Sequence, residues 1–269
     1  MPATDIDNRL AVTATRIRRL IVKCLHKAGS GHPGGSLSMT DLVTVLFFDE
    51  MRTEGENRDR FVLSKGHAAP GLYAAFAELG WIGRDELMSL RQLGSRLQGH
   101  PDRTRFDRLD AGSGALGQGV SIAIGYALAS RMKGVPGRTY CILGDGESQE
   151  GQVWEAALYA PFAKLDNLCF ILDNNNLQNE TWVNETLDLG PLAQKWDSFG
   201  WHTIEIDGHD IDAIRTALAE ARVTKGKPTI IVACTVKGKG VPFMENDNFW
   251  HGGVITDEHL AIALEALGP

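Results

Sequence analysis

The sequence has few cysteines, and they show no pairing pattern. Its four cysteines lie far apart in the chain and form no CxxC pair. This spacing disfavours a disulfide framework or a zinc site and fits buried thiols in a reducing compartment. The chain has no run of 18 apolar residues that could span a membrane, and its first ten residues are charged rather than apolar. We therefore expect a cytoplasmic protein with no membrane partner.

The chain also has no excess of positively charged residues. Lysine and arginine number 27 against 34 aspartates and glutamates, which leaves a formal net charge of −7. Nucleic-acid-binding proteins usually present a basic face, so this balance argues against a nucleic-acid partner. A small phosphorylated ligand is still compatible, because it needs only local charge and backbone N–H groups.

What the sequence has in excess is glycine. Glycine accounts for 30 of the 269 residues, about 11%, against an average of about 7%. The glycines follow no collagen-like period. Hydrophobic residues at 43% and charged residues at 23% are ordinary for a folded globular chain and exclude a disordered one.

The order of the apolar segments predicts an α/β fold. Short apolar runs alternate with amphipathic segments, which predicts a mostly parallel sheet covered by helices on both faces. We expect strands at 61–63, 140–143, 168–172, 202–206 and 229–235. We expect helices at 10–28, 40–51, 69–79, 84–92, 118–132, 152–165, 191–198, 210–223 and 257–267. Residues 93–112 are polar and irregular and are typical of a functional loop. Without a linker or repeat, residues 1–269 are expected to form a single domain.

The glycines gather where such a sheet binds ligands. Ligands of open α/β sheets lie beyond the carboxyl ends of the strands, and glycine permits a ligand to approach the backbone closely. The segments expected at these ends are rich in glycine, lysine and asparagine: 64–67, 144–146, 173–176 and 237–240.

One pair of strand ends has the residue types of a metal site. Gly144-Asp145-Gly146 follows one strand and Asn175 follows the next. Carboxylate and amide oxygens suit Mg²⁺ or Ca²⁺, with phosphate oxygens completing the shell. The flanking glycines and the start of the following helix favour a diphosphate. A pair of simple tight turns is the alternative interpretation.

These residues resemble the thiamine-diphosphate signature, and further motifs narrow the resemblance to transketolases. Three segments resemble histidine loops of that family, a fourth resembles the loop that holds the thiamine rings, and another resembles its fourth histidine site. They are Ser30-Gly31-His32-Pro33-Gly34-Gly35, Ser64-Lys65-Gly66-His67-Ala68, Gly99-His100-Pro101, the 112–119 segment and Trp250-His251-Gly252. The motifs occur in the family's order between residues 10 and 255.

The resemblance implies a thiamine-diphosphate-binding fold and a role for each matching residue. The metal, Mg²⁺ with Ca²⁺ or Mn²⁺ as alternatives, would be bound by Asp145, Asn175 and the main-chain carbonyl of Leu177. Thiamine diphosphate would be bound by His67, Gly114, Ala115, Leu116, Gly144, Gly146, Glu147, Asn175 and His251. His32, His100, His251 and Glu150 would be catalytic residues. The three histidines would line the substrate channel, and Glu150 would lie at the subunit interface.

The positions of the histidines also indicate a functional site, independently of the family resemblance. His26, His202, His209 and His259 lie in ordinary contexts and receive no role. The other four stand beside glycine or proline in loops, which makes four unrelated surface histidines a poor explanation. Imidazoles that titrate near neutral pH can move protons between hydroxyl and carbonyl groups.

Two other patterns have competing interpretations. Gly112-x-Gly114-x-x-Gly117 formally matches the dinucleotide fingerprint, but residues 105–110 before it are no buried strand, and the fingerprint requires one. An NAD site is therefore not favoured. Lys237 and Lys239 either help to neutralise a diphosphate or are simply solvated.

The resemblance covers only the amino-terminal part of a full transketolase. It implies transfer of a two-carbon ketol unit from a ketose, such as a sugar phosphate, to an aldose. It also implies a separate C-terminal subunit that carries the pyrimidine-binding domain, in an α2β2 heterotetramer. The chain departs from the family at Ala115, where proline is frequent, and at residues 178–182. The alternatives are a deoxyxylulose-phosphate synthase fragment, a non-catalytic cofactor-binding protein and a keto-acid dehydrogenase subunit.

Overall fold

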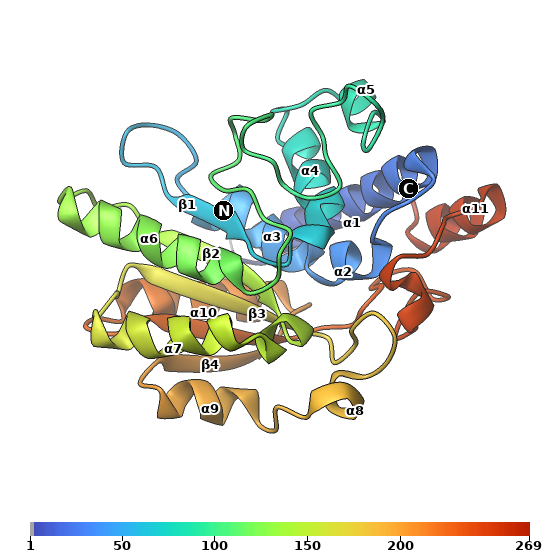
Figure 1. The fold of residues 1–269 in the computed structure, drawn as a ribbon. Helices are drawn as coiled ribbons and strands as arrows, with labels where there is room; N and C mark the ends of the chain where they lie inside the picture. Colours follow the sequence, from blue (N-terminus) through green and yellow to red (C-terminus); the bar gives the residue numbers. More distant parts are fainter. Residues whose placement is uncertain (1–2) are drawn as a thin grey trace.

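The computed structural model describes residues 3–269 and has a five-stranded, fully parallel sheet at its centre (Figure 1). The strand order is β1-β2-β3-β5-β4. The strands are β1 (Arg60–Leu63), β2 (Thr139–Gly144), β3 (Leu168–Asn174), β4 (His202–Asp207) and β5 (Thr229–Cys234). All five predicted strands are confirmed to within a few residues at their ends.

Alternate residues of β1, β2, β3 and β5 enter different hydrophobic cores. On β3, Cys169 and Ile171 pack into one core, whereas Leu168, Phe170 and Leu172 pack into the other. This is the period of two that a strand imposes on its side chains. Because both faces are covered, β2, β3 and β5 are mostly apolar and buried, as expected for a parallel sheet, whereas the edge strand β4 alternates apolar and polar residues. The predicted α/β fold with helices on both faces is confirmed.

The helices form two layers. One core includes residues of α1 (Ala3–Ala28), α2 (Pro33–Ser38), α3 (Thr40–Val45) with its π-helical extension Leu46–Glu50, α4 (Ala69–Glu78), α5 (Arg84–Leu87) and α10 (Ile211–Val223). The other includes residues of α6 (Gln118–Met132), α7 (Gly151–Phe162) and α9 (Leu192–Ser198). Figure 1 shows α6, α7 and α9 running beside the strands, away from α1, with α8 (Val183–Leu187) and α11 (Asp257–Ala266) at the periphery. Within residues 3–269, no helix is both long and apolar enough to cross a membrane.

Two short helices were not predicted. All six residues of α2 are buried, so the helix has no polar face and hence no amphipathic pattern. Pro33 at its first turn fixes the backbone in a conformation that suits a helix start. The other, α8, has only five residues. The predicted helix at 84–92 was too long, because α5 ends at Leu87.

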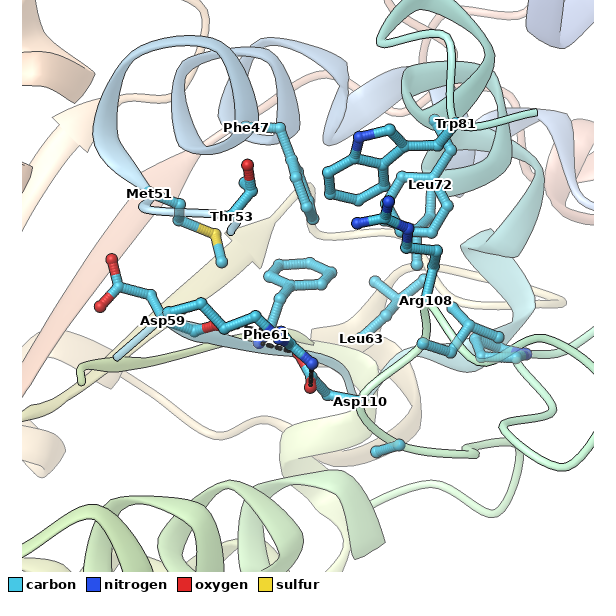
Figure 2. Close-up of a pocket in the computed structure, with 15 residues that line it drawn as sticks. Phe47, Met51, Thr53, Asp59, Phe61, Leu63, Leu72, Trp81, Arg108 and Asp110 are labelled. Carbon is cyan, nitrogen blue, oxygen red and sulfur yellow. Dashed lines mark hydrogen bonds and ion pairs between the residues drawn. The ribbon is translucent and has the colours of Figure 1, made fainter. Parts of the chain in front are cut away.

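A pocket between β1, α4 and the 93–112 loop belongs to the hydrophobic core (Figure 2). Figure 2 shows the rings of Phe47 and Trp81 above that of Phe61; the Phe47 ring meets Phe61 and Trp81 edge-to-face, with centroids 5.0 and 5.9 Å away. The free space inside is about 20 Å³, about the room needed by one water molecule. Asp110 closes its edge by accepting hydrogen bonds from Arg58 and from the N–H of Phe61. This pocket therefore anchors the irregular 93–112 loop to β1 and is too small for a ligand.

Candidate functional site

A cavity of about 300 Å³ opens at the carboxyl ends of β1, β2, β3 and β5. This is the sheet edge at which the sequence predicted a ligand. Ten of the predicted site residues line it: His67, Leu116, Gly144, Asp145, Gly146, Glu147, Glu150, Asn175, Leu177 and His251. Six further residues complete the wall: Gly35, Lys65, Gln149, Gln178, Asn179 and Lys237.

The four loop histidines form one cluster, although they come from four separate segments. His67 and His251 line the cavity, and His32 and His100 lie beside them without lining it. The ring centroid of His32 lies 5.3 Å from that of His67, 6.1 Å from that of His100 and 5.4 Å from that of His251. His67 and His251 stack with centroids 5.0 Å apart. His32 immediately precedes α2, and its buried Nδ1 has no hydrogen-bond partner among residues 3–269. A buried, unpaired imidazole nitrogen is a group for which a ligand could supply the partner.

The environment of these histidines holds them neutral. Burial, with the neighbouring His100 and Arg91, lowers the pKa of His32 to about 4. Burial and Lys237 lower the pKa of His251 to about 3. The pKa values of His67 and His100 are lowered as well, mainly by burial. The expectation of titration near neutral pH was wrong for this chain, because desolvation disfavours the charged imidazole. Neutral imidazoles still donate and accept hydrogen bonds.

Asp145 is a buried carboxylate, and no lysine or arginine of the described chain forms an ion pair with it. It is 3% exposed, and its oxygens accept hydrogen bonds from the backbone N–H groups of Gly146, at 2.7 Å, and of Asn176. Burial and the charge of Asp173 raise the pKa of Asp145 to about 6. A nearby divalent cation would offset both effects.

Asn175 and Leu177 share the cavity wall with Asp145. The side-chain carbonyl of Asn175 accepts a hydrogen bond from the N–H of Leu177 at 3.1 Å. Between them, Asn176 has a φ of 61°, a left-handed conformation that asparagine tolerates better than most residues. The turn brings the amide of Asn175 and the carbonyl of Leu177 to the cavity that Asp145 lines.

This donor set fits a hard divalent cation. It has one carboxylate, one amide oxygen and one main-chain carbonyl, which are ligands that Mg²⁺ and Ca²⁺ accept. Across residues 3–269 no group of three or more His, Cys, Asp or Glu is placed to hold a metal. The Leu177 carbonyl also accepts a hydrogen bond from Lys237 Nζ at 2.9 Å, but a carbonyl oxygen has two lone pairs and can serve both.

Glu147 holds the walls of the cavity together. Its carboxylate accepts hydrogen bonds from the N–H of Gly117 at 2.8 Å, from the N–H of Gly144 at 3.1 Å and from the hydroxyl of Ser64. Burial raises its pKa despite these three donors. The residue thereby ties the start of α6 to the ends of β1 and β2. With its oxygens already engaged by the protein, Glu147 is better placed to support the cofactor loops than to contact a ligand.

The remaining predicted residues lie around the cavity mouth. A Cβ at Gly114 would lie 3.5 Å from the ring of His100, so the ring packs against the backbone of this loop. Leu116 and Ala115 are exposed beside it. Glu150 occupies the N-cap position of α7 without a capping hydrogen bond from its side chain, and it is also exposed.

Two buried lysines line the cavity, although neither received a definite role from the sequence. Lys65 is 2% exposed and pairs through Nζ with Asp173, which is fully buried. Lys237 is also 2% exposed, and its Nζ donates to the carbonyls of Leu177 and Gln178 and to His251 Nδ1, at 2.9, 3.0 and 2.8 Å. The solvated interpretation of Lys237 was therefore wrong. Its position at a predicted strand end was the only available signal.

Comparisons with known proteins agree with this arrangement. The profile of the family described as "Transketolase, thiamine diphosphate binding domain" matches residues 8–269. The chain is 42% identical over 259 residues to the 6-deoxy-6-sulfo-D-fructose transketolase subunit SqwG of Clostridium sp. (strain MSTE9), covering 94% of each chain. It is 37% identical to a subunit of the apulose-4-phosphate transketolase of Phocaeicola vulgatus, covering 93% of this chain and 90% of that relative.

Solved structures give the same result. Transketolase from Campylobacter jejuni subsp. jejuni NCTC 11168 superposes with a TM-score of 0.89 at 33% identity. The match covers 96% of this chain and 42% of that one. The chain therefore spans about two fifths of a full-length transketolase but nearly all of the two relatives described as subunits.

The fold and the cavity thus define an α/β domain that binds thiamine diphosphate. The chain belongs to the transketolase family. The prediction of a transketolase-type transferase subunit is confirmed, and the relatives favour it over the deoxyxylulose-phosphate synthase, keto-acid dehydrogenase and non-catalytic alternatives.

Proposed function

We propose that the chain provides the diphosphate-binding half of an active site for ketol transfer between sugars, shared with a second subunit. The observation that carries the proposal is the convergence of four histidines beside the oxygen-lined end of the cavity. Two relatives with the same extent are described as transketolase subunits, for sulfofructose and for apulose 4-phosphate. These names support a ketose, with or without phosphate, as donor and an aldose as acceptor.

We assign the metal, with Mg²⁺ as the first choice, to Asp145, Asn175 and the Leu177 carbonyl. His67, Gly146 and His251 would contact the diphosphate, with Gly144 behind them, and Gly114, Ala115 and Leu116 would contact the thiamine rings. When bound, thiamine diphosphate supplies the nucleophilic carbon that holds the two-carbon unit. Lys237 adds positive charge to this wall.

The histidines would handle the substrate. Neutral His32 and His100 can hydrogen-bond the hydroxyl and carbonyl oxygens of a sugar, orient it, and accept a proton as charge develops on those oxygens. Their lowered pKa values keep their lone pairs available for this task at neutral pH. His251 already accepts a hydrogen bond at Nδ1 from Lys237, so it would contact the sugar as a donor through its Nε2–H. An anionic ligand in the cavity would raise these pKa values.

The partner we propose is a C-terminal subunit with the pyrimidine-binding domain, in an α2β2 heterotetramer. The exposed Glu150 and the apolar residues on the outer side of α7 support an interface there. The buried free thiols of Cys24, Cys141 and Cys169 are consistent with a cytoplasmic location.

The decisive experiment measures ketol transfer by the purified chain alone and after mixing with the candidate C-terminal subunit. Activity only in the mixture, with a ketose rather than pyruvate as donor, is the expected result. Full activity of the chain by itself would contradict the proposal of a shared site. Turnover with pyruvate would favour the synthase or dehydrogenase type instead.

A second experiment tests the placement of His100. Substitution His100→Ala should lower kcat/KM for ketol transfer by about 100-fold, within the range for lost proton-transfer groups, while thiamine-diphosphate affinity stays near the wild-type value. The converse pattern, lost affinity with intact turnover, would move His100 from the substrate channel to the cofactor.

A further inference from the structure

His209 connects the loop after β4 to the segment that carries Lys237, although it lies outside the cavity. Its Nδ1 is 2.7 Å from a carboxylate oxygen of Asp41, and its Nε2 is 2.8 Å from the backbone N of Val236. The side chain is 11% exposed.

These two contacts determine which nitrogen of the neutral His209 ring carries the proton. A backbone N–H can only donate, so Nε2 must offer its lone pair to Val236. The proton of the neutral ring therefore sits on Nδ1 and is donated to Asp41. Protonating Nε2 would turn it into a second donor facing the N–H of Val236 and would remove the hydrogen bond.

The carboxylate behind His209 is held in place. Arg18 of α1 donates to both oxygens of Asp41, at 3.0 and 2.6 Å, and both side chains are buried. A two-pronged Arg–carboxylate pair fixes orientation as well as distance. His209 is thereby attached to α1 and α3, two helices of the core.

The segment in front of His209 leads directly to the cavity. Val236 precedes Lys237, whose ammonium group joins the Leu177 carbonyl to His251. The next residue is held by a bond from the N–H of Gly238 to the carbonyl of Gly34. A Cβ at Gly238 would come within 2.2 Å of a main-chain oxygen of Met244, so the segment has no slack.

We propose that His209 is a positioning residue that sets the place of Lys237 in the cofactor cavity through the N–H of Val236. The inference rests on the proposed function, since it assumes that the wall formed by Lys237, His251 and Leu177 receives a diphosphate and its metal. His209 itself contacts neither ligand nor substrate.

The test compares two substitutions of His209 by amide side chains that differ in length. In His209→Gln the side chain can place its oxygen where Nε2 accepts from Val236, whereas in His209→Asn it is too short and can contact only Asp41. His202→Asn serves as a remote control, because His202 lies at the end of β4 opposite to His209 and bonds Glu220 at 2.7 Å. Thiamine-diphosphate affinity is measured calorimetrically with Mg²⁺ in the assembled complex, and hydrogen exchange is followed for the peptide covering 234–240.

We expect His209→Asn to lower the affinity by about tenfold, the lower end of the effect of losing a supporting hydrogen bond near a metal site, and to speed exchange in that peptide. His209→Gln and His202→Asn should stay near the wild type in both measurements. Equal behaviour of the Asn and Gln variants would overturn the proposal.

The experiments can overturn the proposed function and the proposed role of His209 independently of each other. If wild-type complex does not bind thiamine diphosphate, the proposed function fails, while exchange in the 234–240 peptide still reports on the His209 contact. If the Asn variant does not fold, nitrogen NMR of the wild-type chain decides from the ring tautomer: a proton on Nδ1 supports the proposal, and a proton on Nε2 overturns it.

Discussion

Two buried carboxylates at the ends of neighbouring strands, Asp173 and Asp145, differ in whether the protein compensates their charge. Asp173 is fully buried, which would raise its pKa, but Lys65 and the hydroxyls of Ser38 and Thr235 outweigh burial and lower it. Asp145 has no such ion pair within residues 3–269, and its pKa is raised. The charge of Asp173 is therefore satisfied within the protein, whereas that of Asp145 is left for a ligand cation.

This difference predicts opposite effects on binding and stability for Asp145→Asn. Mg²⁺-dependent thiamine-diphosphate affinity in the assembled complex should fall at least about tenfold, because a charged hard ligand is lost. The melting temperature of the free chain should hold or rise, because a buried unpaired charge is removed. Calorimetry and a thermal melt measure the two effects, with the exposed Asp197→Asn as control. Unchanged affinity would refute the metal assignment.

A second residue-scale prediction concerns Asp41 and pH. Burial would raise its pKa, but the hydrogen bonds from His209 and Arg18 outweigh it, so the folded-state pKa is lowered. Such a group stabilises the fold above its unfolded pKa, and that contribution is lost as pH falls through the folded value. Asp41→Asn should therefore lower the free energy of unfolding by about 3 kcal/mol at pH 7, because Arg18 loses its buried partner.

Urea unfolding between pH 7 and pH 3 measures that contribution. The gap between wild type and Asp41→Asn should be constant above about pH 5 and should narrow below about pH 4, as the wild-type carboxylate takes up its proton. A gap that stays the same down to pH 3 would show that the charge of Asp41 is not what stabilises the contact.

Among the elements, α6 depends most on a glycine. It begins beside the end of β1, where a Cβ on Gly119 would come within 2.6 Å of the Cα of Ser64. Backbone cannot move aside cheaply, so only glycine lets the helix start this close to the strand. Gly119 thus serves helix–strand packing, and Gly117, whose φ is 78°, forms the turn before α6.

This packing predicts that two glycines of one helix respond oppositely to alanine. Gly119→Ala should lower the free energy of unfolding by about 1–3 kcal/mol through overpacking. Gly125→Ala, on the exposed side of α6 with no atom within 4 Å of the new Cβ, should raise it by about 0.5–1 kcal/mol through helix propensity. Chemical denaturation of both variants measures the contrast, and a stabilised Gly119→Ala would contradict the contact.

Elements were predictable where the sequence shows a clear pattern of apolar residues. The strands β1, β2, β3 and β5 each contain a short apolar run between polar segments, whereas in β4 Ile204 and Ile206 alternate with polar residues. The α2 helix was missed because all its residues are buried, so burial leaves no period in its sequence. The end of α5 was misplaced because residues beyond Leu87 turn into irregular backbone with little change in composition.

At the scale of the whole molecule, the layer formed by α6 and α7 carries apolar side chains that no other part of the described chain covers. Leu158 and Phe162 of α7 are 61% and 81% exposed, and Met132 of α6 is 85% exposed. Glu150, which lines the cavity, lies at the start of the same α7 helix. This continuity supports the proposed assembly, since interfaces bury apolar residues close to shared sites.

The assembly prediction is that Leu158→Glu weakens association with the other subunits while the chain stays folded. The matched control is Val223→Glu at the end of α10, where the valine is 72% exposed in the opposite layer. Analytical ultracentrifugation of the mixed subunits should show a smaller species only for Leu158→Glu, and circular dichroism should be unchanged for both. Normal assembly of Leu158→Glu would place the interface elsewhere.

The sequence by itself determined the parallel α/β fold, the sheet edge at which the cavity opens, and ten of the residues that line this cavity. Apolar runs indicate where the strands lie. Because parallel strands bring their carboxyl ends to one edge of the sheet, Asp145 and Asn175 were expected to lie close together. Only the tertiary structure decided which charges are compensated, because the Lys65–Asp173 and Asp41–His209 contacts join residues more than 100 positions apart in the chain. The buried partners of Asp173 and Asp41 lower the pKa of these two carboxylates, whereas burial without such a partner raises the pKa of Asp145 and leaves it as the carboxylate available to a metal.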